Sequence, residues 1–264
     1  MVRPRWQLPK GVSRESWDYI QSEKIALQYE DFLGQNPLFR LDVDLVQQQI
    51  EPLQKQFSAR ELYVADLGCG TARVARALDS EICRILNIDL SQAMLLRARE
   101  LARERRNAFE LQGNLAELQF LRPDCLHLAV CLFSSLGMLR PREQRIQFLT
   151  QVCDSLKQKG RLVVHVHNRY RSLLDPGGMT WLAYGLLRHL RGKGELGDRV
   201  YPYRGLPRMF LHIYSRRELI ADLQQAGFRT IEILPIHVSG STLLPSSTQL
   251  VGLRAGGFFA VAEK

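Results

Sequence analysis

Short apolar runs alternate with amphipathic stretches through the middle of the chain. The runs between residues 61 and 168 are ELYVADL, CRILNIDL, AFELQG, CLHLAVCLF and GRLVVHVHN, and helical segments separate the first two and the last two. Strand alternating with helix predicts parallel strands joined by right-handed crossovers, which is a doubly wound α/β sheet. SRRELIADLQQAGF and RTIEILPI predict a further helix and strand. GGFFAVAEK follows a polar connection and is expected to enter antiparallel, completing a mostly parallel seven-stranded sheet.

Two regions lie outside this alternation. Ser13 can cap a helix through SWDYIQSEKIALQYEDFL, and a second helix is predicted through LDVDLVQQQIEPLQKQF, where Pro52 predicts a kink or break. We therefore expect residues 1–58 to form a helical cap or substrate region and residues 59–264 the main domain. An insertion at about 169–214, after the fifth strand, contains one plausible helix and then a stretch rich in Gly, Pro, Arg and Tyr.

Composition indicates the class of protein and the state of its cysteines. The chain has 264 residues, of which 45% are hydrophobic and 24% charged, which is typical of a globular domain with a sizeable core. Five cysteines without CxxC spacing predict reduced core thiols and a cytoplasmic setting rather than disulfides or a zinc site. No apolar window reaches the roughly 18 to 20 residues that cross a bilayer, and no membrane partner is expected.

The stretch VADLGCGTAR, residues 64–73, carries the candidate chemistry. Gly68 and Gly70 allow a tight turn and close approach of a ligand to the backbone. Arg73 stands where a dinucleotide site would place a third glycine, which disfavours a dehydrogenase. Asp89 follows Gly70 by 19 residues, as expected of a carboxylate that accepts ribose hydroxyls. Asp66 adds a second carboxylate, which suits a cationic ligand better than a phosphate. A sulfonium, an ammonium and a ribose occur together in S-adenosylmethionine.

With these residues in view, the chain resembles the class I S-adenosylmethionine-dependent methyltransferases. VADLGCGTAR is similar to their first motif, NIDLSQAML to their second, and QGN and LFSSLGML to their segments after the third and fourth strands. The resemblance implies that Asp66, Gly68 and Gly70 hold the methionine part, Asp89 the ribose and Asn114 the adenine. The full expected cofactor-binding set is Asp66, Gly68, Cys69, Gly70, Asp89, Leu90, Asn114, Leu115, Cys131, Phe133 and Ser135. The chain departs from the family at Ala72, at His127 and in the QKG turn before the fifth strand.

Catalytic residues are harder to assign because methyl transfer need not involve a base. His167 and His212 are candidate bases, with structural or surface roles as the alternative for each. Tyr29 resembles the aromatic residue that closes the pocket in many relatives, with core packing as the alternative. His165 shares a strand face with His167, but no carboxylate or cysteine shows ligand spacing with the pair, so no metal is expected.

The methyl acceptor is expected to contact the N-terminal helices and the insertion. Between residues 188 and 217 eight basic residues stand against two acidic ones, with tyrosines between them. Such a surface suits phosphates and stacked bases, and the segment has a weak likeness to tRNA wobble-uridine methyltransferases, although a solvated basic face is at least as plausible. We expect a small or acidic metabolite as the substrate, ahead of tRNA. A non-catalytic methyltransferase-like module that binds RNA or protein is a further alternative.

Overall fold

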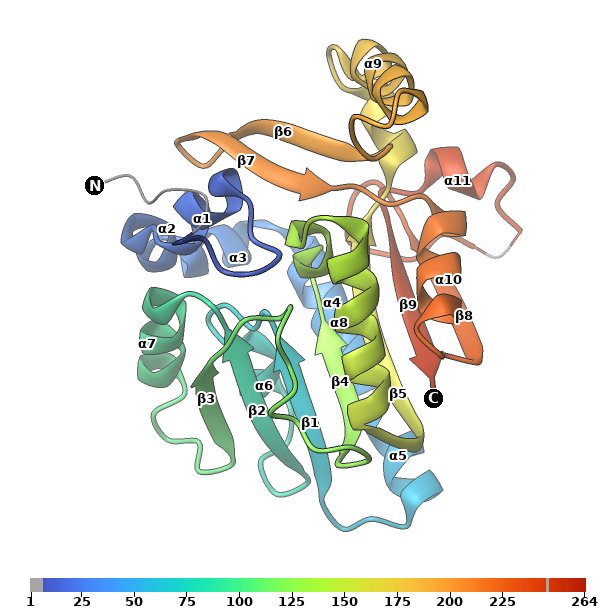
Figure 1. The fold of residues 1–264 in the computed structure, drawn as a ribbon. Helices are drawn as coiled ribbons and strands as arrows, with labels where there is room; N and C mark the ends of the chain where they lie inside the picture. Colours follow the sequence, from blue (N-terminus) through green and yellow to red (C-terminus); the bar gives the residue numbers. More distant parts are fainter. Residues whose placement is uncertain (1–6, 246) are drawn as a thin grey trace.

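The computed structural model describes residues 7–245 and 247–264, and a seven-stranded sheet forms its centre (Figure 1). The strand order is β3-β2-β1-β4-β5-β9-β8. The strands are β1 (Leu62–Leu67), β2 (Cys83–Asp89), β3 (Ala108–Gln112), β4 (Leu126–Cys131), β5 (Leu156–His167), β8 (Thr230–Ile236) and β9 (Gly257–Glu263). Neighbours from β3 to β5 are parallel, and β9 is antiparallel to both β5 and β8. The predicted doubly wound sheet with an antiparallel last strand is confirmed.

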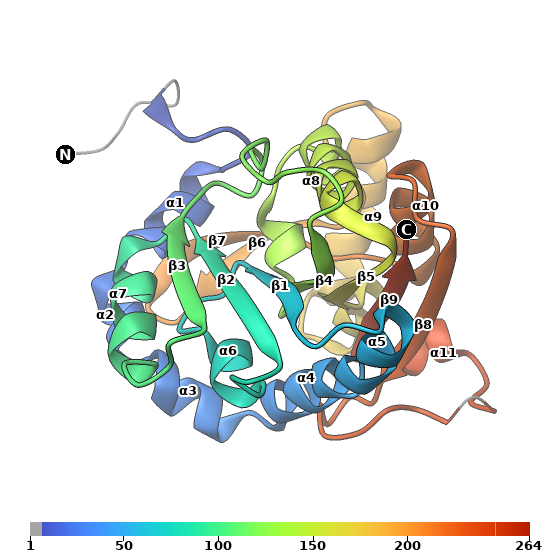
Figure 2. The ribbon, with the colours of Figure 1, turned by 90° about the horizontal axis from the view of Figure 1, so that it is seen from below.

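Helices cover both faces of the sheet (Figure 2). One face carries α4 (Pro37–Gln47), α5 (Ile50–Phe57), α6 (Arg73–Ala77) and α7 (Gln92–Leu101), and the other carries α8 (Arg142–Ser155) and α10 (Arg216–Gln225). Side chains of β1 alternate between these layers, with Leu62 and Val64 on the α4 side and Ala65 and Leu67 on the α8 side. Burial on both faces explains why the strands are continuous apolar runs.

The N-terminal region is divided between two locations. The single helix predicted after Ser13 is broken into α1 (Arg14–Ile20), α2 (Glu23–Leu27) and α3 (Tyr29–Gln35), because Ser22 accepts a backbone N–H and caps a new helix. The break expected near Pro52 lies between α4 and α5, so that this proline occupies the first turn of α5, where no backbone N–H is needed. α4 and α5 belong to the core, whereas α1 to α3 lie beyond the sheet at the carboxyl ends of its parallel strands (Figure 1).

The insertion contains more regular structure than its sequence indicates. It consists of a 3-10 helix, η3 (Arg169–Leu174), then α9 (Gly178–Leu190), and a hairpin of β6 (Asp198–Tyr203) and β7 (Leu206–His212). No hairpin was predicted in the stretch rich in Gly, Pro, Arg and Tyr. Its tight turn uses Arg204 at φ 49° and Gly205 at φ 82°. The hairpin lies across the N-terminal helices, and α1 packs against β7 (Figure 1).

Two short helical elements remain within the described residues. A 3-10 helix, η2 (Ser135–Met138), follows β4, and α11 (Val251–Arg254) precedes β9. The five cysteines are free thiols, and all but Cys125 are buried. Within residues 7–245 and 247–264, no helix combines the length and the apolar character that crossing a membrane would require.

Candidate functional site

The strand order reverses between β1 and β4, which is where ligands bind in open α/β sheets. A pocket lies at this point, between the carboxyl ends of the strands and the N-terminal helices. Of the residues singled out in the sequence, the structure brings nine together in its lining: Tyr29, Gly68, Gly70, Asp89, Leu90, Asn114, Leu115, Phe133 and Ser135. The other five, Asp66, Cys69, Cys131, His167 and His212, are not part of the lining.

The glycine turn after β1 requires both of its glycines. Gly68 has φ 75°, and a Cβ there would lie 2.8 Å from Ser135 Oγ. Gly70 has φ 56°, and a Cβ there would lie 3.4 Å from the Tyr29 ring. Positive φ at both glycines disfavours larger side chains, and at Gly68 the close approach of Ser135 adds a steric conflict. The following α6 begins at Arg73 and is only five residues long.

Asp89 links the two sequence motifs directly. One of its carboxylate oxygens accepts the Gly70 N–H at 2.9 Å, and the other accepts the Ser91 N–H at 2.8 Å. Burial raises the pKa of Asp89, while these backbone hydrogen bonds oppose the rise. Each carboxylate oxygen keeps a second lone pair, so both oxygens can still accept a ligand hydroxyl.

Asp66 lies behind the turn, 3% exposed, and its Oδ2 has no hydrogen-bond partner among the described residues. Burial raises the pKa of Asp66 to about 7; Arg73 lowers it, and Asp89 raises it further. This carboxyl group therefore titrates near neutral pH and would gain from a nearby positive charge. A direct contact of Asp66 with a ligand, which the family resemblance implies, stays a prediction.

The opposite end of the pocket is closed by the N-terminal segment. Asn114 donates to the carbonyl oxygen of Lys10 at 3.0 Å and accepts the Ala116 N–H at 3.1 Å. Arg140 N donates to Gly11 O at 2.8 Å, which fixes the same segment. Apolar side chains from several elements line this end, namely Val12, Ile20, Leu90, Met94, Leu115 and Leu139. Apolar walls beside a few polar groups suit a flat base.

Several lining residues were missed by the sequence analysis. They are Val12, Ser16, Tyr19, Ile20, Arg73, Ser91, Met94, Leu132, Met138 and Leu139. Arg73 Nη2 binds the buried Asp42 at 3.2 Å, and its guanidinium lies 4.7 Å from the Phe39 ring centroid. Nothing in the sequence indicates that the N-terminal residues line the pocket, because the pattern of a capped amphipathic helix does not show which surface the helix packs on. Arg73 was considered only because it stands where a dinucleotide site would have a third glycine.

The two buried thiols and His167 lie just outside the pocket. Burial raises the pKa of the Cys69 thiol well above its ordinary value and that of Cys131 to about 12, so both stay protonated. His167 packs edge-on against Phe133, with ring centroids 5.2 Å apart, and burial lowers its pKa to about 3. It is therefore a neutral imidazole at physiological pH, behind a lining residue. Its role as a base stays a prediction.

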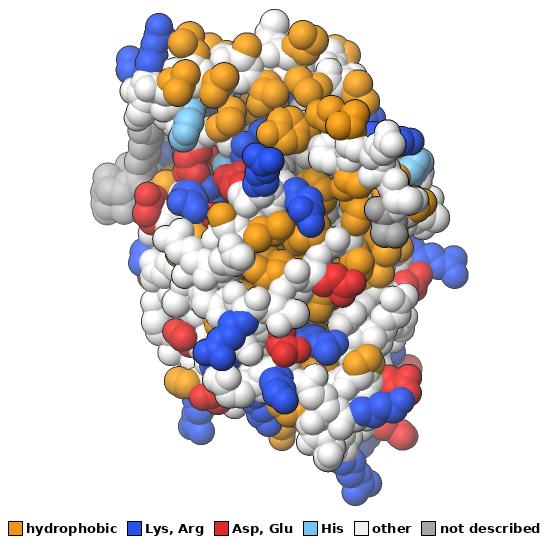
Figure 3. Space-filling view, turned by 90° about the vertical axis from the view of Figure 1, so that its right-hand side faces the viewer, with side chains coloured by type: hydrophobic (Ala, Val, Ile, Leu, Met, Phe, Trp, Pro, Cys, Tyr) orange, Lys and Arg blue, Asp and Glu red, His pale blue; other side chains and the backbone are white. Residues whose placement is uncertain are grey.

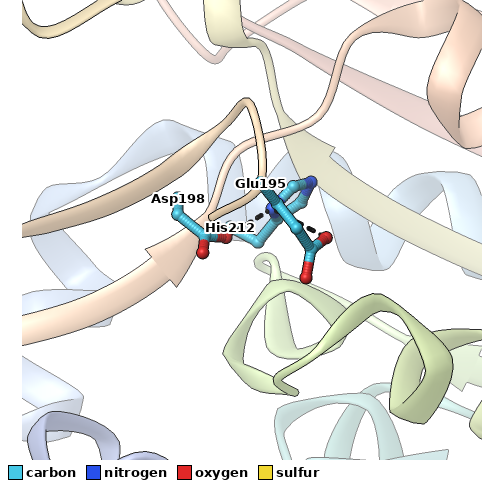
Figure 4. Close-up of side chains that lie close together, drawn as sticks. All are labelled: Glu195, Asp198 and His212. Carbon is cyan, nitrogen blue, oxygen red and sulfur yellow. Dashed lines mark hydrogen bonds and ion pairs between the residues drawn. The ribbon is translucent and has the colours of Figure 1, made fainter. Parts of the chain in front are cut away.

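His212 belongs to a charged network under the hairpin, shown in Figure 4. Its Nδ1 lies 2.9 Å from Asp198 Oδ1 and its Nε2 2.8 Å from Glu218 Oε1, so both ring nitrogens have carboxylate partners. Among the described residues, Glu195, Asp198 and His212 could bring three ligand atoms within 4.8 Å of one another. However, Glu195 pairs with the buried Arg145, and Asp198 lies 3.7 Å from Arg140. These contacts hold the hairpin to α8 and α10 and already neutralise the carboxylates.

Several basic side chains of the predicted nucleic-acid surface have partners within the chain. Arg208 pairs with Glu15 at 3.1 Å, and Arg199 pairs with Asp175 at 3.0 Å. Arg204 donates to Gln28 O at 2.9 Å and lies 4.5 Å from the Phe32 ring centroid. These arginines attach the hairpin to the N-terminal helices and to the end of η3, which reduces the charge available to phosphates.

Comparisons with curated proteins agree with this geometry. Residues 64–160 match the family model of a methyltransferase domain. A candidate methyltransferase of Geobacillus sp. (strain WCH70) is 28% identical over 151 residues, which cover 56% of this chain and 58% of that protein. The match thus spans less than two thirds of that relative. A carboxy-S-adenosyl-L-methionine synthase of Pseudomonas savastanoi is 27% identical over 180 residues, covering 60% of this chain and 70% of the synthase.

Solved structures share the fold at low identity. A methyltransferase from Methanosarcina mazei superposes with a TM-score of 0.60 at 17% identity, covering 81% of this chain and 97% of that one. A Burkholderia thailandensis 1,6-didemethyltoxoflavin-N1-methyltransferase, solved with its substrate and S-adenosylhomocysteine, has a TM-score of 0.58 at 14% identity, covering 94% and 86%. Residues 64–160 therefore match a methyltransferase domain, and the fold is the one that these methyltransferases share.

Proposed function

We propose that the protein transfers a methyl group from S-adenosylmethionine to an O, N or C nucleophile of a small-molecule acceptor. The observation that carries the proposal is the pair of hydrogen bonds by which Asp89 joins the Gly70 turn to the second strand, within a pocket at the β1/β4 switch point. The Asp89 carboxylate and the backbone of the glycine turn therefore both face the pocket. A turn with a purely structural role would not need a carboxylate at this position.

The residues present fit the cofactor at each of its parts. Asp89 would accept the ribose hydroxyls through its remaining lone pairs, and Asn114 with Leu90 and Leu115 would hold the adenine. Gly68 and Gly70 would lie against the methionine part. Asp66, whose Oδ2 is buried without a partner, would stabilise the cationic groups through space, and Arg73 in the lining would attract the carboxylate.

The cofactor, when bound, supplies an activated methyl group, so the protein has only to align the nucleophile and exclude water. Tyr19, Tyr29 and Phe133 wall the pocket beside the glycine turn. Burial raises the pKa of both tyrosines, so their hydroxyls stay protonated and can donate or accept hydrogen bonds. A nucleophile that must lose a proton would need a base, for which neutral His167 behind Phe133 is the candidate. His212 is engaged at both nitrogens and is assigned to holding the hairpin.

A small acceptor is favoured by the cover over the pocket. Residues of the N-terminal segment line the pocket, and the hairpin packs on α1 beyond them, so we expect a folded RNA to have poor access to this space. The arginines that suggested tRNA attach these elements to each other. Among the four similar proteins named above, none is named for tRNA, and the Burkholderia enzyme, by its name, methylates a small molecule.

Calorimetric titration with S-adenosylhomocysteine tests the cofactor site, with NAD as the control ligand. We expect micromolar binding of S-adenosylhomocysteine and none of NAD. A screen of small metabolites and tRNA with methyl-labelled S-adenosylmethionine then tests the acceptor class. Label transferred to tRNA alone would contradict the small-molecule proposal, and binding without any transfer would favour the non-catalytic alternative.

A further inference from the structure

The helix α9 projects from the body of the molecule, at the top of Figure 1. Its beginning is anchored, because a Cβ at Gly178 would lie 1.6 Å from the Ser172 carbonyl oxygen of η3. Further along, Trp181 Nε1 donates to Asp198 O at 3.1 Å. The inner face of α9 therefore rests on η3 and on the start of the hairpin. This leaves the outer face of the helix without cover from the described residues.

The outer face of α9 is mostly apolar, which inverts the usual pattern of a surface helix. Its exposed side chains include the apolar Met179 at 71%, Leu186 at 46%, Leu187 at 44% and Leu190 at 74%, beside Tyr184 at 63% and the polar Thr180 and His189. The three leucines recur at spacings of seven, eight and eleven residues from Met179, so these four side chains form one stripe along the helix. Leu174 at the end of η3 adds another side chain that is 72% exposed. We call Met179, the three leucines of α9 and Leu174 the α9 stripe, and Figure 3 shows apolar side chains gathered over this top surface.

Cations border the stripe without compensating acids. Arg188, Arg191 and Lys193 follow one another at the end of α9, and no acidic residue occurs between residues 176 and 194. The two nearest carboxylates in sequence are already paired, Asp175 with Arg199 and Glu195 with Arg145. The surface thus joins an apolar stripe to a net positive rim.

An anionic lipid surface satisfies both features at once. Leucine and methionine side chains enter the boundary of the acyl chains, while arginine and lysine meet the headgroups. A second copy of the chain would cover the stripe. It would also place the same cations opposite one another, because this surface has no acidic residues between residues 176 and 194 to pair with them. A nucleic acid would meet the cations but leave the stripe in water.

In contrast to the expectation from the sequence that there is no membrane partner, we propose that α9 docks the protein peripherally on membranes that carry anionic lipids. The helix lies beyond the hairpin, on the side of the molecule where the parallel strands have their carboxyl ends (Figure 1). This inference is independent of the methyl acceptor.

Sedimentation with lipid vesicles tests the proposal. The full chain is mixed with vesicles of phosphatidylcholine alone or of phosphatidylcholine with 30% phosphatidylglycerol, at low and at physiological salt. The test variant carries Met179→Asp and Leu190→Asp. The matched control carries Leu96→Asp and Phe109→Asp, which change the charge equally at side chains that are 54% and 53% exposed on α7 and β3.

We expect the unmodified protein to bind the anionic vesicles and to bind neutral ones far more weakly. The stripe variant should lose roughly tenfold or more in partition coefficient, since two large apolar side chains no longer leave water, whereas the control should lose less than about threefold. Absence of vesicle binding, or an equal loss in the control, would overturn the proposal. So would a dimer in light scattering that only the stripe variant converts to a monomer, because a second copy would then cover the stripe.

Discussion

Removing the Asp89 carboxylate is the most direct test of the cofactor site. Asp89→Ala deletes the acceptor proposed for the ribose hydroxyls and leaves the N–H groups of Gly70 and Ser91 without their acceptor. Hydrogen bonds to a charged acceptor contribute about 1.5–3 kcal/mol. The loss corresponds to a dissociation constant for S-adenosylhomocysteine that is about 10 to 150 times weaker. Relief of the buried charge offsets part of the cost to folding, since the raised pKa of Asp89 indicates that burial disfavours its ionised form.

Isothermal titration at pH 7.5 measures this change, and thermal melting shows whether the variant folds. Asp79→Ala is the matched control, because Asp79 also accepts a backbone N–H, from Glu81 at 2.8 Å, in a turn that is not part of the pocket lining. The control should bind within about twofold of the unmodified protein. A folded Asp89→Ala variant with unchanged affinity would refute the placement of the ribose.

Three further predictions concern the turn, its buried carboxylate and the cover of the pocket. Gly68→Ala should weaken S-adenosylhomocysteine binding more than about tenfold in titration. The added Cβ would lie too close to Ser135, and alanine disfavours the φ of 75° at this position. Unchanged affinity would show that the turn tolerates a side chain. For Asp66 the folded pKa lies near 7, above its ordinary 3.8, so the ligand-free protein should lose stability as pH rises between these values. Asp66→Asn should flatten that decline in thermal melts, and an unchanged slope would contradict the assignment. Arg204→Ala should speed S-adenosylhomocysteine release in stopped-flow experiments by about threefold or more, through loss of its contacts with Gln28 and Phe32; an unchanged rate would show that the hairpin does not hold the cover closed.

The strand and cofactor motifs were predictable because local sequence determines them. Asp66 and Asp89 lie in the last two residues of β1 and β2, and the carboxyl ends of neighbouring parallel strands meet at one edge of a sheet. The glycines of the turn follow from the same logic. The fold class and the core of the pocket could therefore be stated before any coordinates.

The cover of the pocket was not predictable in the same way. Tyr19 and Ile20 reach the pocket only through the docking of α1 on β7, a contact between segments almost two hundred residues apart. The partner carboxylates of His212 come from the start of the hairpin and from α10, so its engagement at both nitrogens was hidden in the sequence. The exposed α9 stripe was equally hidden, since an apolar helix in sequence is expected to be buried.

The N-terminal segment that closes the pocket has a kinetic consequence. We expect the hydrogen bonds from Arg140 to Gly11 and from Asn114 to Lys10 to open when a cofactor enters or a spent one leaves. Opening of such a cover often limits turnover more than the chemical step does. We therefore expect S-adenosylhomocysteine to leave slowly and to compete with fresh cofactor. In a cell, the rate of methylation would then follow the ratio of the two cofactor forms rather than the supply of acceptor.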